Sequence, residues 1–261
     1  MDMANAITGD FDVAQLTLYL FWAFFFALVV WIQRENMREG FPLISERTEE
    51  KLPYAAIPMP EPKTFKLPHG GGEKQVPGPG QDDPRSFDDA LARSGPDLGS
   101  PLVPTGDPLA DGVGPAAFAE RADVPDMTLH GDVKIVPMRV AGEWAIAAGS
   151  RDIRGRDVVS GDDHVVGTVK DVWVDRSESM IRYVEIELKD GGGVRLAPFT
   201  LCLCNWLKPT VTIRSLYAHN FAGVPTTAKP EQITLLEEDK ISAYYCGGLL
   251  YASKAREETL I

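Results

Sequence analysis

The stretch VAQLTLYLFWAFFFALVVWI, residues 13–32, runs for twenty residues without a charge, and the first Lys or Arg of the chain is Arg34. At a rise of about 1.5 Å per residue, a helix of this length spans about 30 Å, which is the thickness of the hydrocarbon core of a bilayer. In lipid, only a helix satisfies so many consecutive backbone groups within one segment. The stretch therefore predicts one transmembrane helix, over residues 13–33.

A signal peptide is the alternative for an apolar segment near an N-terminus. Signal peptides have a basic start and a small-residue cleavage site. Here Asp2, Asp10 and Asp12 precede the apolar stretch, and Trp31 to Arg34 end it. These features favour an uncleaved anchor.

The orientation of the anchor follows from its flanking charges. Arg34 and Arg38 come shortly after the span, whereas no Lys or Arg precedes it. Basic residues close to a span tend to stay in the cytoplasm. We therefore expect residues 1–12 outside and the main domain inside, as a single-pass protein held against membrane lipids.

Composition limits the classes of partner. The formal net charge is −12 and the sequence pI is about 4.8. Nucleic-acid binding needs a basic surface, so we expect no nucleic acid partner. An acidic surface beside a membrane could instead collect protons, although solubility explains such a charge equally well.

The chain has three cysteines: Cys202, Cys204 and Cys246. Three are too few for a disulfide framework, and an odd number cannot all be paired within the chain. In a reducing cytoplasm we expect free thiols. Cys202 and Cys204 would point to one face of a strand, where buried packing is expected. No clustered His or Cys completes a metal site, so none is predicted.

Residues 53–115 contain thirteen of the twenty prolines of the chain. Proline at this density excludes a regular helix and a central strand. We therefore expect residues 34–120 to form an extended segment along the membrane surface. Apolar residues spaced through it could hold it against a partner protein: Phe65, Leu67, Val76, Leu102, Val103 and Phe118.

From about Lys134 onward the pattern is typical of strands. Residues 165–175, VVGTVKDVWVD, and residues 183–188, YVEIEL, alternate in the manner of paired antiparallel strands. The sequence Asp-Gly-Gly-Gly at 190–193 predicts a turn. Further strands are expected in the runs VRLAP, LCLCNWL and TVTIRSL. Several short, closely spaced strands favour a small closed barrel within residues 121–261.

A C-terminal helix is predicted after this barrel. Thr234 and Glu237 form a capping box that opens the helix. We expect it to run to about Cys246 and to end at Gly247-Gly248. The acidic residues of its first turn, which include Glu238, are accounted for by capping and by the helix dipole.

The chain resembles the H subunit of the photosynthetic reaction centre of purple bacteria, over nearly its whole length. Five ordered segments carry the resemblance: FWxFFxxLVxxxQRENMREGFPL at 21–43, PKTFKLPHG at 62–70, PTGDPLADGVGPAAF at 104–118, DVWVD at 171–175, and TLLEEDKI with YYCGGLLYA between 234 and 252. The resemblance implies one N-terminal transmembrane helix, an extended surface segment, and a mainly β cytoplasmic domain of the PRC-barrel type with a C-terminal helix.

The resemblance also implies a function and partners. The chain would be a non-enzymatic subunit in the bacterial inner (intracytoplasmic) membrane, with residues 1–12 in the periplasm. It would itself bind no cofactor and no metal, and would cover the L and M subunits. The complex carries bacteriochlorophyll, bacteriopheophytin, quinones and non-haem iron. Light-harvesting 1 polypeptides and a cytochrome subunit are further possible partners.

The resemblance further implies a proton route to the secondary quinone. In this family an inner acid and its neighbours correspond to Asp175, Glu178 and Arg182 here. We expect Glu178 to be the inner relay carboxylate, with Asp175 as its companion and Arg182 as the cation that tunes both. Burial or like charge can raise a carboxylate pKa toward neutrality, as a relay requires. The local sequence alone would favour an ordinary charged turn between two strands.

The proton entry site departs from the family pattern. Family members commonly have an Asp and two His before KIxPM, where this chain has Thr128, His130 and Asp132. The loss of one imidazole and one carboxylate weakens any metal site. His130 and Asp132 could still accept protons, with Asp126 nearby, or they could be ordinary exposed loop residues. Another family acid corresponds to Gln232, so its role is expected to be lost or displaced to Glu231.

Two other classes of function agree less well with the sequence. A free-standing membrane-anchored PRC-barrel adaptor would need neither the extended segment nor the motif at residues 104–118. A membrane-bound hydrolase or metalloenzyme is disfavoured, because no nucleophile elbow or HExxH motif occurs in the sequence.

Overall fold

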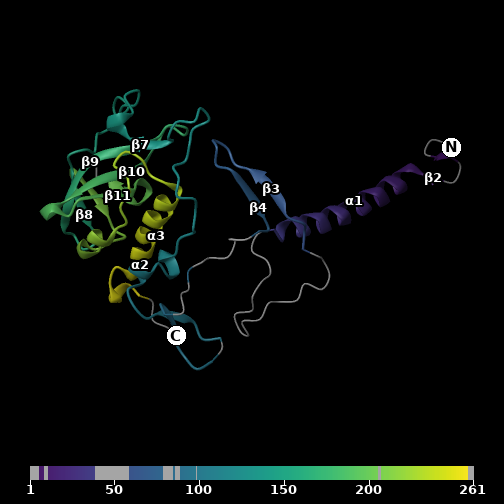
Figure 1. Cartoon of the computed structure of the whole chain (residues 1–261), viewed down its shortest axis with the longest axis horizontal. Helices are drawn as coiled ribbons and strands as arrows, with labels where there is room; N and C mark the ends of the chain where they lie inside the picture. The colour runs from purple at the N-terminus through teal and green to yellow at the C-terminus, as the bar shows by residue number, and fades with distance from the viewer. Residues whose placement is uncertain are drawn as a thin grey trace. The chain divides into compact units, whose positions relative to one another are not determined.

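The computed structural model describes residues 6–8, 11–38, 59–78, 85, 89–97, 99–204 and 207–257 (Figure 1). The chain divides into two compact units. The first comprises Met1–Arg85 with Asp97–Gly99, and the second comprises Ser86–Pro96 with Ser100–Ile261. Asp2 and Asp10, together with part of the predicted strand LCLCNWL, lie outside the described residues.

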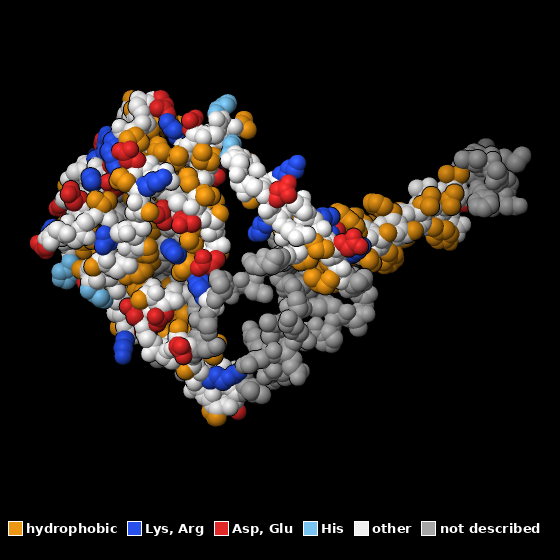
Figure 2. Space-filling view, in the orientation of Figure 1, with side chains coloured by type: hydrophobic (Ala, Val, Ile, Leu, Met, Phe, Trp, Pro, Cys, Tyr) orange, Lys and Arg blue, Asp and Glu red, His pale blue; other side chains and the backbone are white. Residues whose placement is uncertain are grey.

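Helix α1 (Val13–Asn36) confirms the predicted N-terminal helix and extends three residues beyond the predicted span. Asp12 begins it, because Asp12 Oδ1 accepts a hydrogen bond from the Ala14 N–H at 2.9 Å. None of its residues is buried in the chain, and apolar side chains cover its visible surface (Figure 2). By length and composition, α1 is a candidate membrane span.

The end of α1 is tied to a β-hairpin within the first unit. Strands β3 (Lys63–Lys66) and β4 (Glu73–Val76) pair antiparallel. The Arg38 guanidinium donates to the carbonyl oxygens of Glu61 and Val76. Glu35 Oε2 accepts from Lys63 Nζ at 2.6 Å. The short strands β1 (Ala6–Thr8) and β2 (Phe11–Asp12) precede the helix.

The proline-rich segment contains more regular structure than expected. In addition to β3 and β4, strands β5 (Leu91–Arg93) and β6 (Leu102–Pro104) form a two-stranded sheet. Helix α2 (Pro108–Asp111) corrects the expectation that prolines exclude a helix here. Pro108 occupies the first turn, where the missing N–H has no intrahelical partner. The expectation of no central strand holds for these described strands, since each pair forms a sheet of two strands.

The second unit is built on a seven-stranded sheet with the order β11-β10-β9-β8-β13-β12, and with β7 also paired to β9. Its strands are β7 (Ile135–Pro137), β8 (Asp157–Ser160), β9 (Val165–Asp175), β10 (Met180–Leu188), β11 (Val194–Pro198), β12 (Cys202–Cys204) and β13 (Thr210–Ile213). All neighbours are antiparallel except β13 and β8. The predicted β9–β10 pair is confirmed; β7 and β8 were not predicted individually.

The two faces of the β9–β10 ladder differ in chemistry. On one face, Val172 pairs with Val184 and both are fully buried. On the other, Trp173 pairs with Tyr183, and Asp171 pairs with Glu185. Strand alternation places Asp175 on this second face as well. Asp171, Asp175 and Glu185 therefore lie on one face of these two strands.

Helix α3 (Leu235–Tyr251) begins at the predicted capping box but does not end at Gly247-Gly248. Both glycines lie inside the helix because neighbouring segments pack against them. A Cβ on Gly247 would lie 2.5 Å from the Ala116 Cβ, and one on Gly248 would lie 2.3 Å from Leu216 Cδ2. The glycines thus permit close packing of α3 rather than ending it.

The core of the second unit is one cluster of buried residues from the sheet, from α3 and from the segments that pack against them. Its largest fully buried side chains include Trp173 of β9 and Tyr245 of α3. Phe221, which lies in the short 3-10 helix over Ala218–Gly223, is a third. Phe221 and Tyr245 form an edge-to-face pair with ring centroids 6.3 Å apart. The hydrogen bond from Tyr183 to Glu238 places the first turn of α3 next to the Tyr183 side chain of β10.

Candidate functional site

Lys134 joins two residues that the sequence placed in separate sites. Its Nζ lies 3.1 Å from Asp126 Oδ2 and 3.7 Å from Asp175 Oδ2. The register of β7 on β9 produces this contact, because Ile135 pairs with Asp175 and Lys134 directly precedes Ile135. We call Asp126, Lys134, Asp175, Glu178 and Arg182 the Asp175 cluster.

Asp175 is the centre of this cluster and is fully buried. Its Oδ1 accepts hydrogen bonds from the backbone N–H groups of Ser177 at 2.9 Å and Glu178 at 3.0 Å. Its Oδ2 accepts from Arg182 Nε at 3.1 Å. Buried charge is tolerated when it is paired and hydrogen-bonded in this way.

Glu178 lies in the turn between β9 and β10 and is exposed on the surface of the chain. Its backbone N–H, rather than its carboxylate, contacts Asp175. The predicted trio of Asp175, Glu178 and Arg182 is thus brought together, with Asp175 inside and Glu178 at the surface. A carboxylate in this position is available to a partner chain.

Lys134 is a permanent cation in this environment. Burial alone would lower its pKa, but the hydrogen bond to Asp126 and the charge of Asp175 raise the pKa of Lys134 overall. Sequence reasoning missed this residue, although it is the first residue of the KIVPM motif at 134–138.

The predicted entry residues lie on a small turn that begins and ends beside Lys134. The Thr128 N–H donates to the Asp132 carbonyl at 2.8 Å, and the Lys134 N–H donates to the Asp126 carbonyl at 2.9 Å. His130 and Asp132 are exposed at its tip. The turn therefore extends from solvent to the Asp175 cluster.

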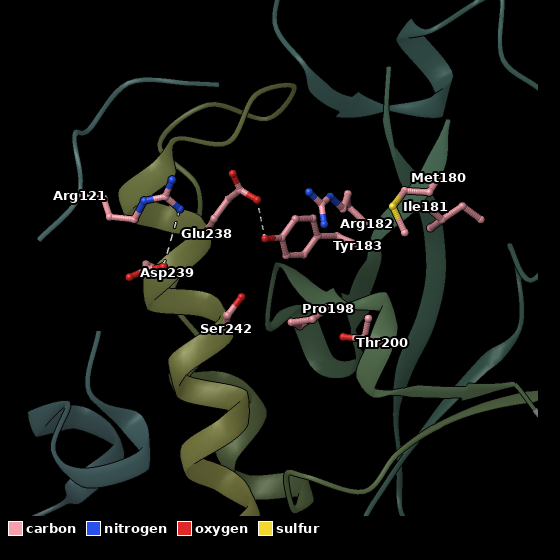
Figure 3. Close-up of a pocket in the computed structure, with 10 residues that line it drawn as sticks. All are labelled: Arg121, Met180, Ile181, Arg182, Tyr183, Pro198, Thr200, Glu238, Asp239 and Ser242. Atoms are coloured by element: carbon pink, nitrogen blue, oxygen red, sulfur yellow. Dashed lines mark hydrogen bonds and ion pairs between the residues drawn. The ribbon is translucent and has the colours of Figure 1, made fainter. Parts of the chain in front are cut away.

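Glu238 is a further carboxylate near the cluster that sequence reasoning did not select. The capping box uses Glu237, which accepts from the Thr234 N–H at 2.8 Å. Glu238 instead accepts from the Tyr183 hydroxyl at 2.8 Å (Figure 3). Capping, which we expected to account for Glu238, therefore does not explain its main contact. The sequence offers one signal: Glu238 lies one residue beyond the capping box.

Burial raises the pKa of Glu238 above its usual range, against the lowering effects of the Tyr183 hydrogen bond and of Arg182. Burial and the nearby Glu238 charge also raise the pKa of Tyr183. Among the described carboxylates in and beside the Asp175 cluster, Glu238 is the one whose pKa is raised. A raised carboxylate pKa is what a proton relay requires.

A cavity of about 310 Å³ opens beside this pair. In Figure 3 the Glu238 and Tyr183 side chains point toward each other, and Arg182 lies beside Tyr183. Arg182, which is a member of the Asp175 cluster, also lines this cavity. The cavity is lined by Arg121, Met180, Ile181, Arg182, Tyr183, Pro198, Thr200, Glu238, Asp239 and Ser242.

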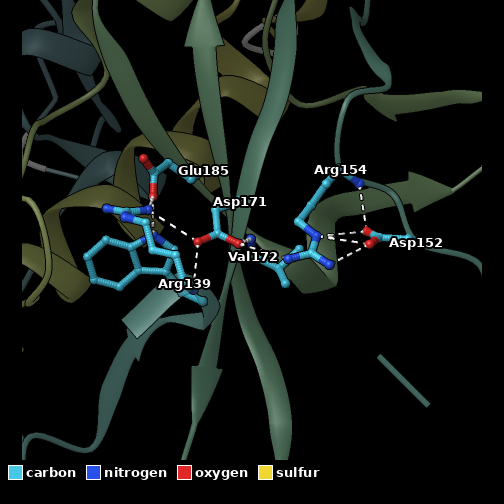
Figure 4. Close-up of polar contacts among 7 residues, drawn as sticks. Arg139, Asp152, Arg154, Asp171, Val172 and Glu185 are labelled. Carbon is cyan, nitrogen blue, oxygen red and sulfur yellow. Dashed lines mark hydrogen bonds and ion pairs between the residues drawn. The ribbon is translucent and has the colours of Figure 1, made fainter. Parts of the chain in front are cut away.

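A second charged network lies on the same face of β9 and β10 (Figure 4). The Arg139 guanidinium lies 2.6 Å from Glu185 Oε2 and 3.2 Å from Asp171 Oδ2. Trp173 Nε1 also donates to Glu185 Oε2, at 2.8 Å. Asp171 and Glu185 are both almost completely buried. Sequence alternation placed them on one face but did not identify their partner, Arg139.

Glu231 is exposed and lies next to Pro230, whose carbonyl accepts from Arg139 NH2 at 2.9 Å. Among the described residues, no hydrogen bond or ion pair joins the Glu231 side chain to the Asp175 cluster. The geometry thus leaves Glu231 apart from the other predicted proton-transfer residues.

The Cys-x-Cys pair lies on one face of β12, as its spacing predicted. Cys202 is buried and Cys204 is half-buried. Burial raises the pKa of both thiols. The described cysteines are free.

Comparison with protein families accounts for most of the chain. Residues 5–140 match the model of the photosynthetic reaction centre H-chain N-terminal region, which is more than half of the 261 residues. Residues 147–211 match the PRC-barrel domain and cover strands β8 to β12. The fold inferred from the resemblance is thereby confirmed. The two matches, in this order and behind a candidate membrane helix, show that the chain belongs to the family of photosynthetic reaction centre H subunits.

Proposed function

We propose that this H subunit is a non-catalytic accessory subunit that stabilises the L and M subunits, shields their quinone sites and conducts protons from the cytoplasm to the secondary quinone. In this proposal the chain binds no pigment, quinone or iron itself. Bacteriochlorophyll, bacteriopheophytin, quinones and non-haem iron belong to the partner chains.

The anchor supports the part of this proposal that concerns assembly. No residue of α1 is buried within the chain, so lipid or partner helices are needed to cover its apolar side chains. Arg34 and Arg38 at its C-terminal end favour a cytoplasmic main domain and a periplasmic N-terminus in the inner membrane. Phe65 and Leu67 of the hairpin segment are also exposed and apolar, which suits a surface that lies on L and M.

The observation that carries the proton-transfer proposal is the contact of Lys134 with both Asp126 and Asp175. This contact connects the base of the exposed turn with the buried carboxylate. His130 and Asp132 collect protons at the exposed tip, and Asp126 receives them at the base of the turn. Asp175 and then Glu178 pass them toward the partner chain.

The cations of the path have a supporting role. Lys134 and Arg182 carry permanent charge beside Asp175, and they hold the carboxylates close together despite their like charge. Glu238, whose pKa is raised by burial, acts as a reservoir that takes a proton and returns it to the path.

The proton-transfer proposal is tested by Glu178→Gln in the intact complex. Flash-induced proton uptake and the second electron transfer to the secondary quinone should slow, while the first electron transfer, which needs no proton, should not change. Glu187→Gln is the matched control, because Glu187 is exposed on the same β10 strand. If the second transfer has the same rate in Glu178→Gln and in the control, Glu178 has no place on the route.

The assembly proposal has its own test. The tagged chain is extracted from its native membrane in mild detergent, and the near-infrared absorption of the purified material is recorded. Stoichiometric bacteriochlorophyll together with two hydrophobic chains is the expected result. A colourless protein without partners would contradict the assignment to L and M.

A further inference from the structure

A mainly apolar cavity of about 230 Å³ lies in the second unit, among residues other than those of the Asp175 cluster. Ile153, Ile181 and Phe199 contribute apolar side chains to its wall. Arg151 and Arg156 line the same cavity, as does the thiol of Cys204. An apolar space that also presents two guanidinium groups has the chemistry of a site for an amphiphile with a negative head.

The positive charge at this cavity is local. The chain as a whole carries a formal charge of −12, yet residues 151–156 contain three arginines and one aspartate. Arg154 pairs with Asp152 at 2.6 Å and lies 3.8 Å from Asp171, so its charge is engaged on the side of the second network (Figure 4). Arg156 forms no ion pair within the part of the chain that the structure describes.

The charge of Arg156 acts on Cys204, another residue of the cavity wall, and also on Asp152. Burial raises the pKa of the Cys204 thiol, and the charge of Arg156 opposes this increase. An anion at the position favoured by this field would be stabilised for the same reason as a thiolate. Arg is suited to bind a carboxylate or a phosphate, because its planar guanidinium presents paired N–H donors.

The size of the cavity limits the ligand. Binding sites for drug-sized molecules usually measure roughly 300–1,000 Å³. This cavity is smaller and would take a short alkyl chain rather than a helix or an aromatic cofactor. Contact with Ile153, Ile181 and Phe199 would remove that chain from water, which is the main source of affinity for an apolar group.

We infer that this cavity binds the end of an anionic amphiphile, with a short alkyl chain between Ile181 and Phe199 and a carboxylate or phosphate head at Arg156 and Arg151.

The test uses the complex in lipid nanodiscs, with Cys246→Ser to remove the exposed thiol. Cys202 is buried, so N-ethylmaleimide reports on Cys204 by peptide mass spectrometry. Hexanoate, hexyl phosphate and hexan-1-ol are compared as protecting ligands, because six-carbon chains enter lipid only weakly. Half-protection by hexanoate or hexyl phosphate is expected on the order of 1 mM, as befits so small a ligand.

The arginine variants decide whether the head is recognised. Arg156→Gln and, separately, Arg151→Gln should raise the concentration for half-protection at least fivefold, whereas Arg214→Gln, an exposed arginine outside the cavity, should not. The half-protection concentration is used because Arg156→Gln also changes the intrinsic reactivity of Cys204. If Cys204 proves unreactive, broadening of the hexanoate proton NMR lines gives the same comparison.

Three results would overturn the inference: no protection by either anion, equal protection by hexan-1-ol, or half-protection concentrations that neither arginine variant changes. Protection by hexyl phosphate alone would identify a phospholipid-type head, and protection by hexanoate alone a fatty-acid head. Both results support the inference and separate the two sources of the ligand.

Discussion

The Tyr183 hydroxyl donates a hydrogen bond to Glu238 Oε2 at 2.8 Å and thereby joins strand β10 to the first turn of α3. The contact bridges 55 positions of sequence. It gives Glu238 a buried partner, in contrast to Glu237, which serves the capping box of the same helix. Two adjacent glutamates thus have different physical roles.

The first prediction concerns proton transfer through Glu238. Glu238→Gln removes the raised-pKa carboxyl but can keep an oxygen acceptor for Tyr183. We expect flash-induced proton uptake to slow on the order of 10-fold, less than the loss of a direct acid catalyst because other carboxylates remain. Tyr183→Phe removes a contact that lowers the Glu238 pKa, so it should move the fall in uptake rate to higher pH.

A structural role alone would give a different result. If Glu238 only holds α3 in place, Glu238→Gln and Tyr183→Phe would reduce thermal stability, and the pH profile of proton uptake would stay unchanged in both variants. The exposed Glu187→Gln serves as the control for the general effect of removing one negative charge from the subunit.

The second prediction concerns the pH dependence of stability. The pKa of Glu238 is higher in the folded chain than in the unfolded chain, where it is about 4.3. The resulting stabilisation is fully present below the unfolded pKa and is lost as pH rises through the folded pKa. Glu238→Gln cannot ionise and escapes this loss. Its melting temperature relative to wild type should therefore be higher at pH 8 than at pH 4.5.

This comparison is made on the full chain in detergent, with intrinsic tryptophan fluorescence, to which the buried Trp173 of the barrel contributes. A difference between variant and wild type that is constant from pH 4.5 to pH 8 would mean that Glu238 does not titrate differently in the two states. A difference that falls with rising pH would give Glu238 a lowered pKa, against the sign expected here.

The third prediction concerns the two glycines inside α3. Alanine has a helix propensity about 1 kcal/mol better than glycine, so an unhindered site would gain stability. However, a Cβ at Gly247 would lie 2.5 Å from the Ala116 Cβ, and one at Gly248 would lie 2.6 Å from the Ser215 carbonyl oxygen. We expect Gly247→Ala and Gly248→Ala each to lower the free energy of unfolding by about 1–3 kcal/mol.

Cys246→Ala is the matched control for these substitutions, because Cys246 is exposed on the same helix. Its effect should remain within about 0.5 kcal/mol. Chemical denaturation of the three variants measures the difference. Increased stability in either glycine variant would mean that α3 does not pack closely on residues 116 and 215–216.

The glycine pair also shows where sequence reasoning reaches its limit. The charge-free stretch predicted α1, alternation predicted β9 and β10, and the capping box predicted the start of α3. Each of these signals is local. The end of α3 was predicted wrongly because a Gly-Gly pair can either end a helix or admit a neighbour, and the neighbours, Ala116 and Leu216, are distant in sequence.

The candidate site shows the same contrast between local signals, which sequence reasoning finds, and contacts distant in sequence, which it misses. Family resemblance selected Asp175, Glu178 and Arg182, and the turn between β9 and β10 brings them together. Lys134 was missed because its contact with Asp175 depends on β7, a three-residue strand too short to have a sequence period. Glu238 was missed because capping gave a sufficient local explanation for an acid in a first helical turn.

The last prediction separates the two carboxylates at the end of β9. Asp175 accepts two backbone N–H bonds and the Arg182 bond in a fully buried position, whereas Glu178 is exposed. Asp175→Asn places an amide beside Arg182 and Lys134, whose charges then lack a buried carboxylate. Because both cations are partly exposed, we expect a loss of about 2 kcal/mol rather than the 3–5 kcal/mol of a fully buried pair.

Glu178→Gln, in contrast, should change the free energy of unfolding by less than about 0.5 kcal/mol, because within the described part of the chain its exposed carboxylate makes no hydrogen bond or ion pair and acts on Lys134 only through its charge. Denaturation of the full chain measures stability, and the second electron transfer in the complex measures proton delivery. A slow second transfer in a fully stable Glu178→Gln subunit would locate the proton step at the surface of the turn. Equal destabilisation by both substitutions would contradict the expected difference between Asp175, which also stabilises the fold, and Glu178, which only relays protons.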